Sequence, residues 1–196
     1  MKEPKQNKGA LSGSPPDVSS FGEIMGHPYV NEETFKGIKH GIFGFRTLEE
    51  ARLLCELVSS QTNDPIIVGI GLIELMVNAI EHGNLEITYD EKGLLLKKGI
   101  WQKEVLRRLD LPKYKNRMAT LMYDRSDKLI NVLITDEGDG FDSEKFLQNQ
   151  TQVRKEDSSG SQYHGRGIAV ASQLDFENIE YLGNGNQVRV SILAKE

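Results

Sequence analysis

A long apolar run, "IIVGIGLIELMVNAI" at residues 66–80, constrains this chain more than any other feature. Apolar residues lie on nearly every side of a helix drawn through it, so it predicts a buried helix that begins at Pro65 and runs to "HGN" at 82–84, where Gly83 favours a left-handed stop. Three polar side chains interrupt the pattern at intervals of four residues: Glu74, Asn78 and His82. This spacing places all three on one face of the helix. Because an unpaired buried carboxylate is costly, they either form a satisfied polar core or line a cavity for a polar ligand, and the spacing favours neither.

The three side chains suit a phosphate-binding cavity in different ways. The amide oxygen of Asn78 is the type of ligand that Mg²⁺ takes beside substrate phosphates. Glu74, one turn earlier, could accept the proton of a nucleophile that attacks a phosphate. His82, at the helix end, is more typical of a partner for the helix dipole than of a catalyst.

The remaining elements indicate one layered domain. "TLEE" at residues 47–50 is a capping box and predicts a helix over about 48–60. Strand-like runs occur at "HGIFGF", "MATLMYD", "KLINVLITD", "FENIEYL" and "QVRVSIL", and the second and third, like the last two, are spaced as hairpins. A further short helix is predicted at "IAVASQL". This order predicts an α+β fold with helices on one face of a mainly antiparallel sheet.

Two segments depart from this pattern. Residues 1–20 are rich in Lys, Ser, Pro and Gly and predict a disordered tail, which leaves 21–196 as a single domain. Residues 86–117 form an insertion that contains a predicted helix and eight Lys or Arg residues between Lys97 and Arg117. These cations either form a solvated helix face, the favoured interpretation, or dock an acidic partner.

Composition limits the classes of partner. A net charge of -5 gives no general attraction to nucleic acid or to anionic membranes. The apolar run is shorter than the roughly 18–20 residues that a membrane span needs, and the N-terminus lacks the apolar region of a signal peptide. Cys55 is the only cysteine, so no internal disulfide is possible. We therefore expect a cytoplasmic protein with no direct contact to nucleic acid or membrane.

Two glycine-containing turns follow the polar helix. "LITDEGDGFD" ends a strand at Asp136, after which Gly138 and Gly140 permit either a close approach to a flat ligand or an ordinary turn. Asp136 offers acceptors, which match the exocyclic amine of adenine. "HGRGIAVA" places Gly165 and Gly167 before a helix, an arrangement that can bind an anion but that also occurs without one. Neither turn has the pattern of a Walker loop or of a dinucleotide-binding loop.

Taken in order, "ELMVNAIEHGN", "DEGDGFD" and "HGRGI" resemble the N-box and the two glycine boxes of the GHKL ATPase and kinase superfamily, over roughly residues 40–193. The chain looks most similar to the anti-sigma-factor serine kinases of bacterial partner-switching systems, through its "NAIEHGN" ending, its "DEGDGFD" form and its small size. This resemblance implies the Bergerat ATP-binding fold, a two-layer sandwich with helices on one face of a mixed, mainly antiparallel sheet.

The resemblance also implies roles for individual residues. Asn78 matches the asparagine that coordinates Mg²⁺, Glu74 the general base, and Asp136 the aspartate that binds the adenine amine. Residues 143–164 match the lid over the triphosphate. The other positions that it assigns to the nucleotide are His82, Gly138, Gly140, Phe141, Gly165, Arg166, Gly167 and Ile168. One departure is the pair Asn186 and Gln187, which stands where the superfamily commonly has a Gly-Thr that helps to hold adenine through water.

The function implied is that of an ATP- and Mg²⁺-dependent serine/threonine protein kinase. It would phosphorylate a STAS-type antagonist and bind a sigma factor or another regulator, and the resemblance also implies a homodimer. One alternative is an ATP-gated binding module without turnover, against which Glu74 argues. The other, the catalytic domain of a histidine kinase, is disfavoured because the 40 N-terminal residues are too short for a dimerising helical hairpin.

Overall fold

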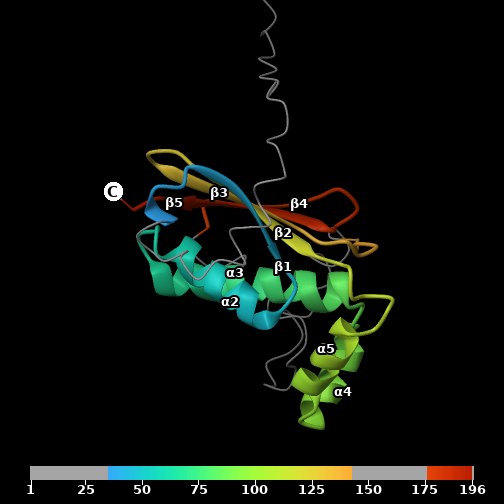
Figure 1. Ribbon diagram of the computed structural model, residues 1–196. Coiled ribbons are helices and arrows are strands. Elements are labelled where there is room, and N and C mark those ends of the chain that lie inside the picture. The colour runs from blue at the N-terminus through green and yellow to red at the C-terminus, as the bar shows by residue number, and fades with distance from the viewer. Residues whose placement is uncertain (1–34, 143–175, 196) are drawn as a thin grey trace, which may run out of the picture.

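The computed structural model describes residues 35–142 and 176–195, which form two layers (Figure 1). One layer is a five-stranded sheet in the order β1-β2-β3-β5-β4, with every pairing antiparallel. Its strands are β1 (His40–Phe45), β2 (Ala119–Arg125), β3 (Leu129–Thr135), β4 (Asn178–Leu182) and β5 (Gln187–Leu193). Helices α2 (Leu48–Ser59) and α3 (Pro65–Asn78) cover one face of this sheet. The predicted α+β architecture and both hairpins are confirmed.

The core lies between the two layers and follows from the alternation of the strands. In β2, residues Leu121 and Tyr123 are 0% and 1% exposed, whereas Met122 between them is 45% exposed. Successive side chains of a strand point to opposite faces, so one face of the sheet is apolar and packs on the helices. The helical contribution to this core includes Leu54, Val58, Val68, Leu72, Leu75 and Met76.

The predicted capping box at the start of α2 is present. The Thr47 hydroxyl accepts a hydrogen bond from the Glu50 backbone N–H at 3.1 Å, and the Glu50 carboxylate accepts one from the Thr47 N–H at 2.9 Å. Both bonds satisfy amide groups that have no partner within the helix. Helix α2 therefore begins where the sequence predicts.

The apolar helix ends within the predicted "HGN" at 82–84, because it continues beyond α3 as a π-helix, η2 (Ala79–Asn84). Two other predictions for this helix are wrong. Gly83 is not left-handed, and the residue with a positive φ beyond the helix end, of 54°, is Glu86. The helix is also not buried on every side, because Ile66 and Ile70 are 75% and 45% exposed. Gly83 serves close packing instead of a left-handed turn, since a Cβ there would lie 2.3 Å from Cγ of Asp136.

The helix from Pro65 to Asn84 has 20 residues, which by length and composition would suffice to cross a bilayer. Core helices share this property. Here Leu72, Leu75 and Met76 are at most 2% exposed and belong to the core between helix and sheet. The apolar run 66–80 is by itself too short for a span, and the helix reaches 20 residues because it includes Pro65 and the more polar residues 81–84.

The insertion forms a helical hairpin that projects from the two layers (Figure 1). It consists of α4 (Tyr89–Lys97) and α5 (Trp101–Leu109), so the segment contains two helices where one was predicted. Thr88 caps α4 through its hydroxyl, which accepts from the Glu91 N–H at 3.2 Å. The predicted N-terminal tail and the "IAVASQL" helix lie outside the described residues.

Candidate nucleotide-binding site

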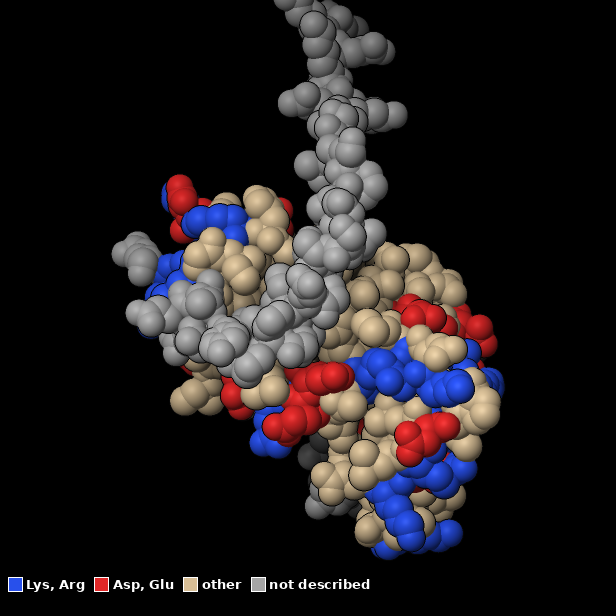
Figure 2. Space-filling view, in the orientation of Figure 1, with Lys and Arg blue, Asp and Glu red and all other residues tan. Residues whose placement is uncertain are grey.

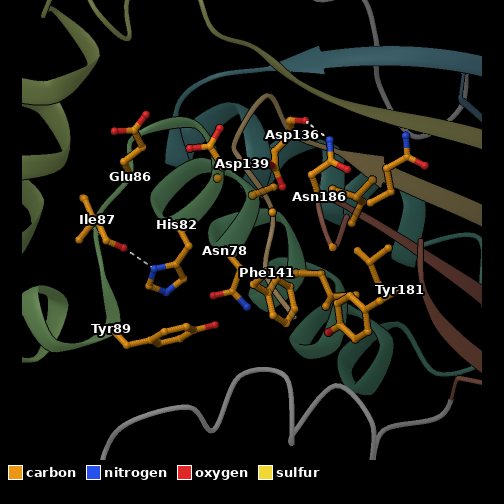
Figure 3. A pocket seen from close by; sticks show the side chains of 18 of the residues that line it. Asn78, His82, Glu86, Ile87, Tyr89, Asp136, Asp139, Phe141, Tyr181 and Asn186 are labelled. Carbon is orange, nitrogen blue, oxygen red and sulfur yellow. Dashed lines mark hydrogen bonds between the residues drawn. The ribbon is translucent and has the colours of Figure 1, made fainter. Parts of the chain in front are cut away.

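A cavity of about 350 Å³ opens between η2, the end of α3 and the adjoining ends of β3 and β5 (Figure 3). Its volume falls within the range of small-molecule sites. The apolar part of its lining includes Leu75, Ile134 and Val188, which come from the helix and the sheet. Five of the residues predicted to bind nucleotide line it as well: Asn78, His82, Asp136, Gly140 and Phe141. The structure thus brings together side chains from two motifs far apart in the sequence.

Asp136 is fixed at the cavity by its backbone and by its own side chain. Its N–H donates to the carbonyl of Asn186 at 3.0 Å, and the Asn186 amide donates to the Asp136 carbonyl at 3.1 Å. The Gly138 N–H donates to Oδ1 of Asp136 at 2.8 Å. Burial raises the pKa of the Asp136 carboxyl to about 6, because the charged form loses hydration. The group still ionises at neutral pH and then presents acceptors to the cavity.

The glycines of the turn allow backbone segments to meet. Gly140 has a φ of +76°, and a Cβ on it would lie 2.2 Å from the carbonyl oxygen of Asn184. A Cβ on Gly138 would lie 2.7 Å from Cα of Gly83. Gly138 is not among the lining residues, so its effect on the pocket is indirect: it lets the turn pack against the π-helix. Gly140 lines the cavity directly.

His82 is a neutral ring that supports the pocket wall. Its Nδ1 donates a hydrogen bond to the carbonyl of Ile87, and its ring stacks on Tyr89 with centroids 4.0 Å apart (Figure 3). Burial lowers the pKa of His82 to about 4. A neutral imidazole cannot supply the charge of the helix-dipole partner that its position predicted. Its contacts instead fix the chain between η2 and α4.

The predicted polar stripe is divided by the structure. Asn78 lines the cavity, and within the described part of the chain no side chain is bonded to its amide, which leaves its oxygen available to a cation. Glu74 lies one turn earlier, half-buried, and is not among the residues that line the cavity. Burial is the main cause of the raised pKa of the Glu81 carboxyl, and the charge of Glu74 adds to it. Asn78 and His82 therefore share a site that Glu74 adjoins.

Several lining residues were not predicted. Glu86, Ile87, Thr88 and Tyr89 enter from the start of the insertion, where no motif marked them. Tyr181 of β4 also lines the cavity, with its ring edge-on to Phe141 at a centroid distance of 5.4 Å. Asn186 and Gln187 line it too, at the place where the resemblance put a Gly-Thr that helps to hold adenine. Gly165, Arg166, Gly167 and Ile168 lie outside the described residues.

A buried helix end carries a further unpredicted contact. The side-chain oxygen of Asn84, which is 3% exposed, accepts from the Glu137 N–H at 2.8 Å. Its backbone carbonyl accepts from Arg117 at 2.9 Å. Asn84 is the last residue of "HGN", a sequence that predicted the end of a helix but not a contact with Glu137.

The two-layer fold and a cavity that joins the polar helix to the glycine turn define the class as an ATPase domain of the GHKL type. A family model described as the histidine kinase-like ATPase domain matches residues 46–192, and the chain belongs to this family. No curated protein matches the chain significantly. Membership of this family indicates ATP binding with ATPase or kinase-like activity.

Proposed function

We propose that this protein is a cytoplasmic, ATP-dependent serine/threonine protein kinase of the anti-sigma-factor type. In this proposal it phosphorylates a STAS-domain antagonist and binds a sigma factor or another regulator, as a homodimer. The observation that carries it is the position of Glu74, one helical turn before the cavity-lining Asn78. In this proposal the half-buried Glu74 carboxylate takes the proton of the substrate hydroxyl beside the phosphate site.

Recognition of adenine is assigned to Asp136. Its ionised carboxylate accepts hydrogen bonds, and the exocyclic amine of adenine donates them, whereas guanine has no donor at that ring position. The surrounding cavity has apolar walls, including Leu75 and Val188, that suit a flat base. We therefore assign ATP, not GTP, as the phosphoryl donor.

Phosphoryl transfer follows from the two polar positions on α3. Asn78 would hold Mg²⁺ through its amide oxygen, and the ion would neutralise charge on the phosphate oxygens. Glu74 takes the proton of the substrate serine as the serine oxygen forms its bond to the γ-phosphorus. The bond from that phosphorus to the bridging oxygen breaks, and ADP leaves with the electron pair. Positioning and electrostatics supply most of the rate enhancement in such a reaction.

The test is transfer of radiolabelled γ-phosphate from ATP to purified STAS-domain proteins encoded near this gene. Glu74→Gln keeps the shape of the side chain but removes the base, so we expect transfer to fall by about a hundredfold or more, with ATP affinity retained. Glu56→Gln, an exposed glutamate on α2, is the matched control and should transfer like the wild type. Undiminished transfer by Glu74→Gln would contradict the assignment.

A second function, an ATP-gated binding module without turnover, is favoured by one observation. Gln187 lines the cavity at a position where the family commonly has another residue type. This alternative predicts that ATP changes the affinity for an antagonist while no phosphate is transferred to any of the proteins offered. Binding assays with ATP and with a non-hydrolysable analogue distinguish it, because a module responds equally to both.

A further inference from the structure

We propose that the α4–α5 hairpin is a docking surface for an acidic protein partner, and that its base connects this partner to the nucleotide pocket. The inference deepens the proposed function, since it identifies where the substrate protein binds and rests on nucleotide binding at the cavity. It concerns the part of the chain that no motif explains.

The tip of the hairpin, defined as residues 94–106, exposes unusually many large apolar side chains. Leu94, Leu96, Ile100 and Leu106 are between 43% and 62% exposed. The described residues contain ten exposed large apolar side chains, and four of them lie in this short segment. A concentration of exposed apolar residues on a projecting element is typical of an interaction surface.

The same tip carries cations that are not paired with any carboxylate of the described residues. Lys97, Lys98 and Lys103 are exposed, and within the described ranges no carboxylate pairs with them. The other cations of α4 and α5 are paired: Lys92 with Glu81, and both Arg107 and Arg108 with Glu104. Figure 2 shows blue and tan surface interleaved over the projecting hairpin. This cationic tip belongs to a chain with a net charge of -5.

Charge and shape together favour an acidic protein over a membrane. Apolar anchors within a rim of complementary charge are typical of protein interfaces. Lipid-binding clusters generally have about four to eight cations, whereas this tip has three that are unpaired. In addition, Leu94 and Leu96 are two positions apart on α4, which places them on nearly opposite sides of the helix. A projecting knob with apolar residues on two sides fits a protein cleft better than a flat lipid surface.

The base of the hairpin is anchored beside the pocket by a buried carboxylate. Glu81, in η2, is 0% exposed. Its Oε1 accepts a hydrogen bond from the Trp101 indole N–H, and its Oε2 lies 2.5 Å from Nζ of Lys92. Trp101 belongs to α5 and Lys92 to α4, so one side chain holds both helices. Glu81 directly precedes His82, which lines the cavity.

Two further contacts join the hairpin to the pocket wall. Arg108 of α5 donates to the carbonyl of Leu85 at 2.8 Å and to that of Glu86 at 3.0 Å. Tyr89, the first residue of α4, lines the cavity and stacks on His82. The chain that enters the hairpin is therefore also a wall of the nucleotide pocket. A partner that shifts the hairpin changes that wall, and by linkage the nucleotide changes the affinity for the partner equally.

The test compares two charge-reversal triples in the full-length protein. One carries Lys97→Glu, Lys98→Glu and Lys103→Glu at the tip; the control carries Lys39→Glu, Lys128→Glu and Lys195→Glu, which are exposed and lie near the sheet. The probe is the purified STAS-domain protein encoded nearest to this gene, titrated by calorimetry and used as phosphate acceptor. We expect the tip triple to weaken binding and raise KM by about tenfold or more, and the control by less than about twofold. Affinity for MgADP alone should stay within about twofold of the wild type in both.

Each outcome separates the inference from the proposed function. Transfer by the wild type with an unchanged KM in the tip triple overturns the docking surface and leaves the kinase assignment intact. Binding that depends on the tip, without any transfer, supports the docking surface and contradicts the kinase. Absence of both binding and transfer overturns both. Sedimentation with phosphatidylglycerol vesicles that the tip triple abolishes would instead assign the tip to a membrane and overturn the protein partner.

The connection to the pocket has a separate measurement. We expect the antagonist to change the MgADP dissociation constant of the wild type by about fivefold or more. Trp101→Phe removes the bond to Glu81 and should reduce this coupling while antagonist binding at the tip persists. An MgADP affinity that is the same with and without bound antagonist overturns the coupling.

Discussion

The side-chain oxygen of Asn84 accepts a hydrogen bond from the backbone N–H of Glu137, a residue 53 positions away, at 2.8 Å. Beside this contact, Gly83 lies against the Asp136 side chain. The end of η2 and the turn after β3 thus form one packed corner. The position of the Asp136 carboxylate is consequently set by the helix that carries Asn78.

Substitution of Gly83 should disturb this corner. A Cβ at Gly83 would lie 2.3 Å from Cγ of Asp136, so Gly83→Ala must displace the carboxylate or the turn. We expect a loss of about 1–3 kcal/mol in the free energy of unfolding and a weaker affinity for ATP. Urea denaturation and calorimetric titration measure the two effects.

Gly69→Ala is the matched control for that substitution. A Cβ at Gly69 would lie 3.5 Å from the Ser59 hydroxyl, an ordinary contact, and Gly69 is within α3. Alanine is favoured over glycine in a helix by up to about 1 kcal/mol, so this variant should be as stable as the wild type or more so. Equal destabilisation by both substitutions would contradict the packing role of Gly83.

Base selectivity should depend on one oxygen of Asp136. Asp136→Asn retains a carbonyl oxygen for the Gly138 N–H but turns the second acceptor into a donor, which opposes the adenine amine. We expect the affinity for ATP to fall by about tenfold or more, with little change in the affinity for GTP. Calorimetry with both nucleotides distinguishes this loss from general damage to the pocket.

ATP affinity should also depend on pH. Burial raises the pKa of Asp136 to about 6, so the carboxylate takes up a proton as the pH falls through that value and loses its acceptor character. We expect affinity for ATP to decrease between pH 7 and pH 5, with a smaller slope in Asp136→Asn. A flat profile in the wild type would show that the ionised form is not the one that binds.

The pH dependence of stability should reveal two opposed groups. Burial lowers the pKa of His82 from 6.5 to about 4. Between these values the unfolded chain binds a proton that the folded chain excludes, so the free energy of unfolding decreases as the pH is lowered. Asp136 acts in the other direction between about pH 6 and its ordinary 3.8, because there the folded chain binds the extra proton. Of these two effects, only that of His82 remains in Asp136→Asn. We therefore expect that variant to lose stability more steeply than the wild type from pH 6 to pH 4, as measured by denaturation at each pH.

The hairpin should depend on its anchor. Trp101→Phe keeps an aromatic ring but removes the hydrogen bond to the buried Glu81 carboxylate. Leaving such a group short of a partner costs about 1–3 kcal/mol. We expect faster amide hydrogen exchange in α4 and α5 with little change in β2 and β3. Uniformly faster exchange would indicate global destabilisation in place of a released hairpin.

The sequence by itself determined the elements and the identity of the polar residues. Periods of two and of 3.6 residues, with the Thr47 cap, specify strands and helices through contacts between near neighbours, which is why β1, α2 and both hairpins were predicted. The motifs around Asn78 and Asp136 each left a structural role open, and a nucleotide site was indicated only by their resemblance, taken in order with "HGRGI", to the GHKL superfamily.

Only the tertiary structure decided which of these residues line the cavity and which pack elsewhere. It placed Glu74 beside the cavity instead of in its lining, gave Gly83 to packing against Asp136, and brought Tyr89 into the pocket wall from an insertion without a motif. Each of these facts depends on contacts between distant segments and on a π-helical turn that alters the helical phase after Asn78. Local periodicity does not predict such contacts, because they form only when the sheet, the long helix and the hairpin pack together.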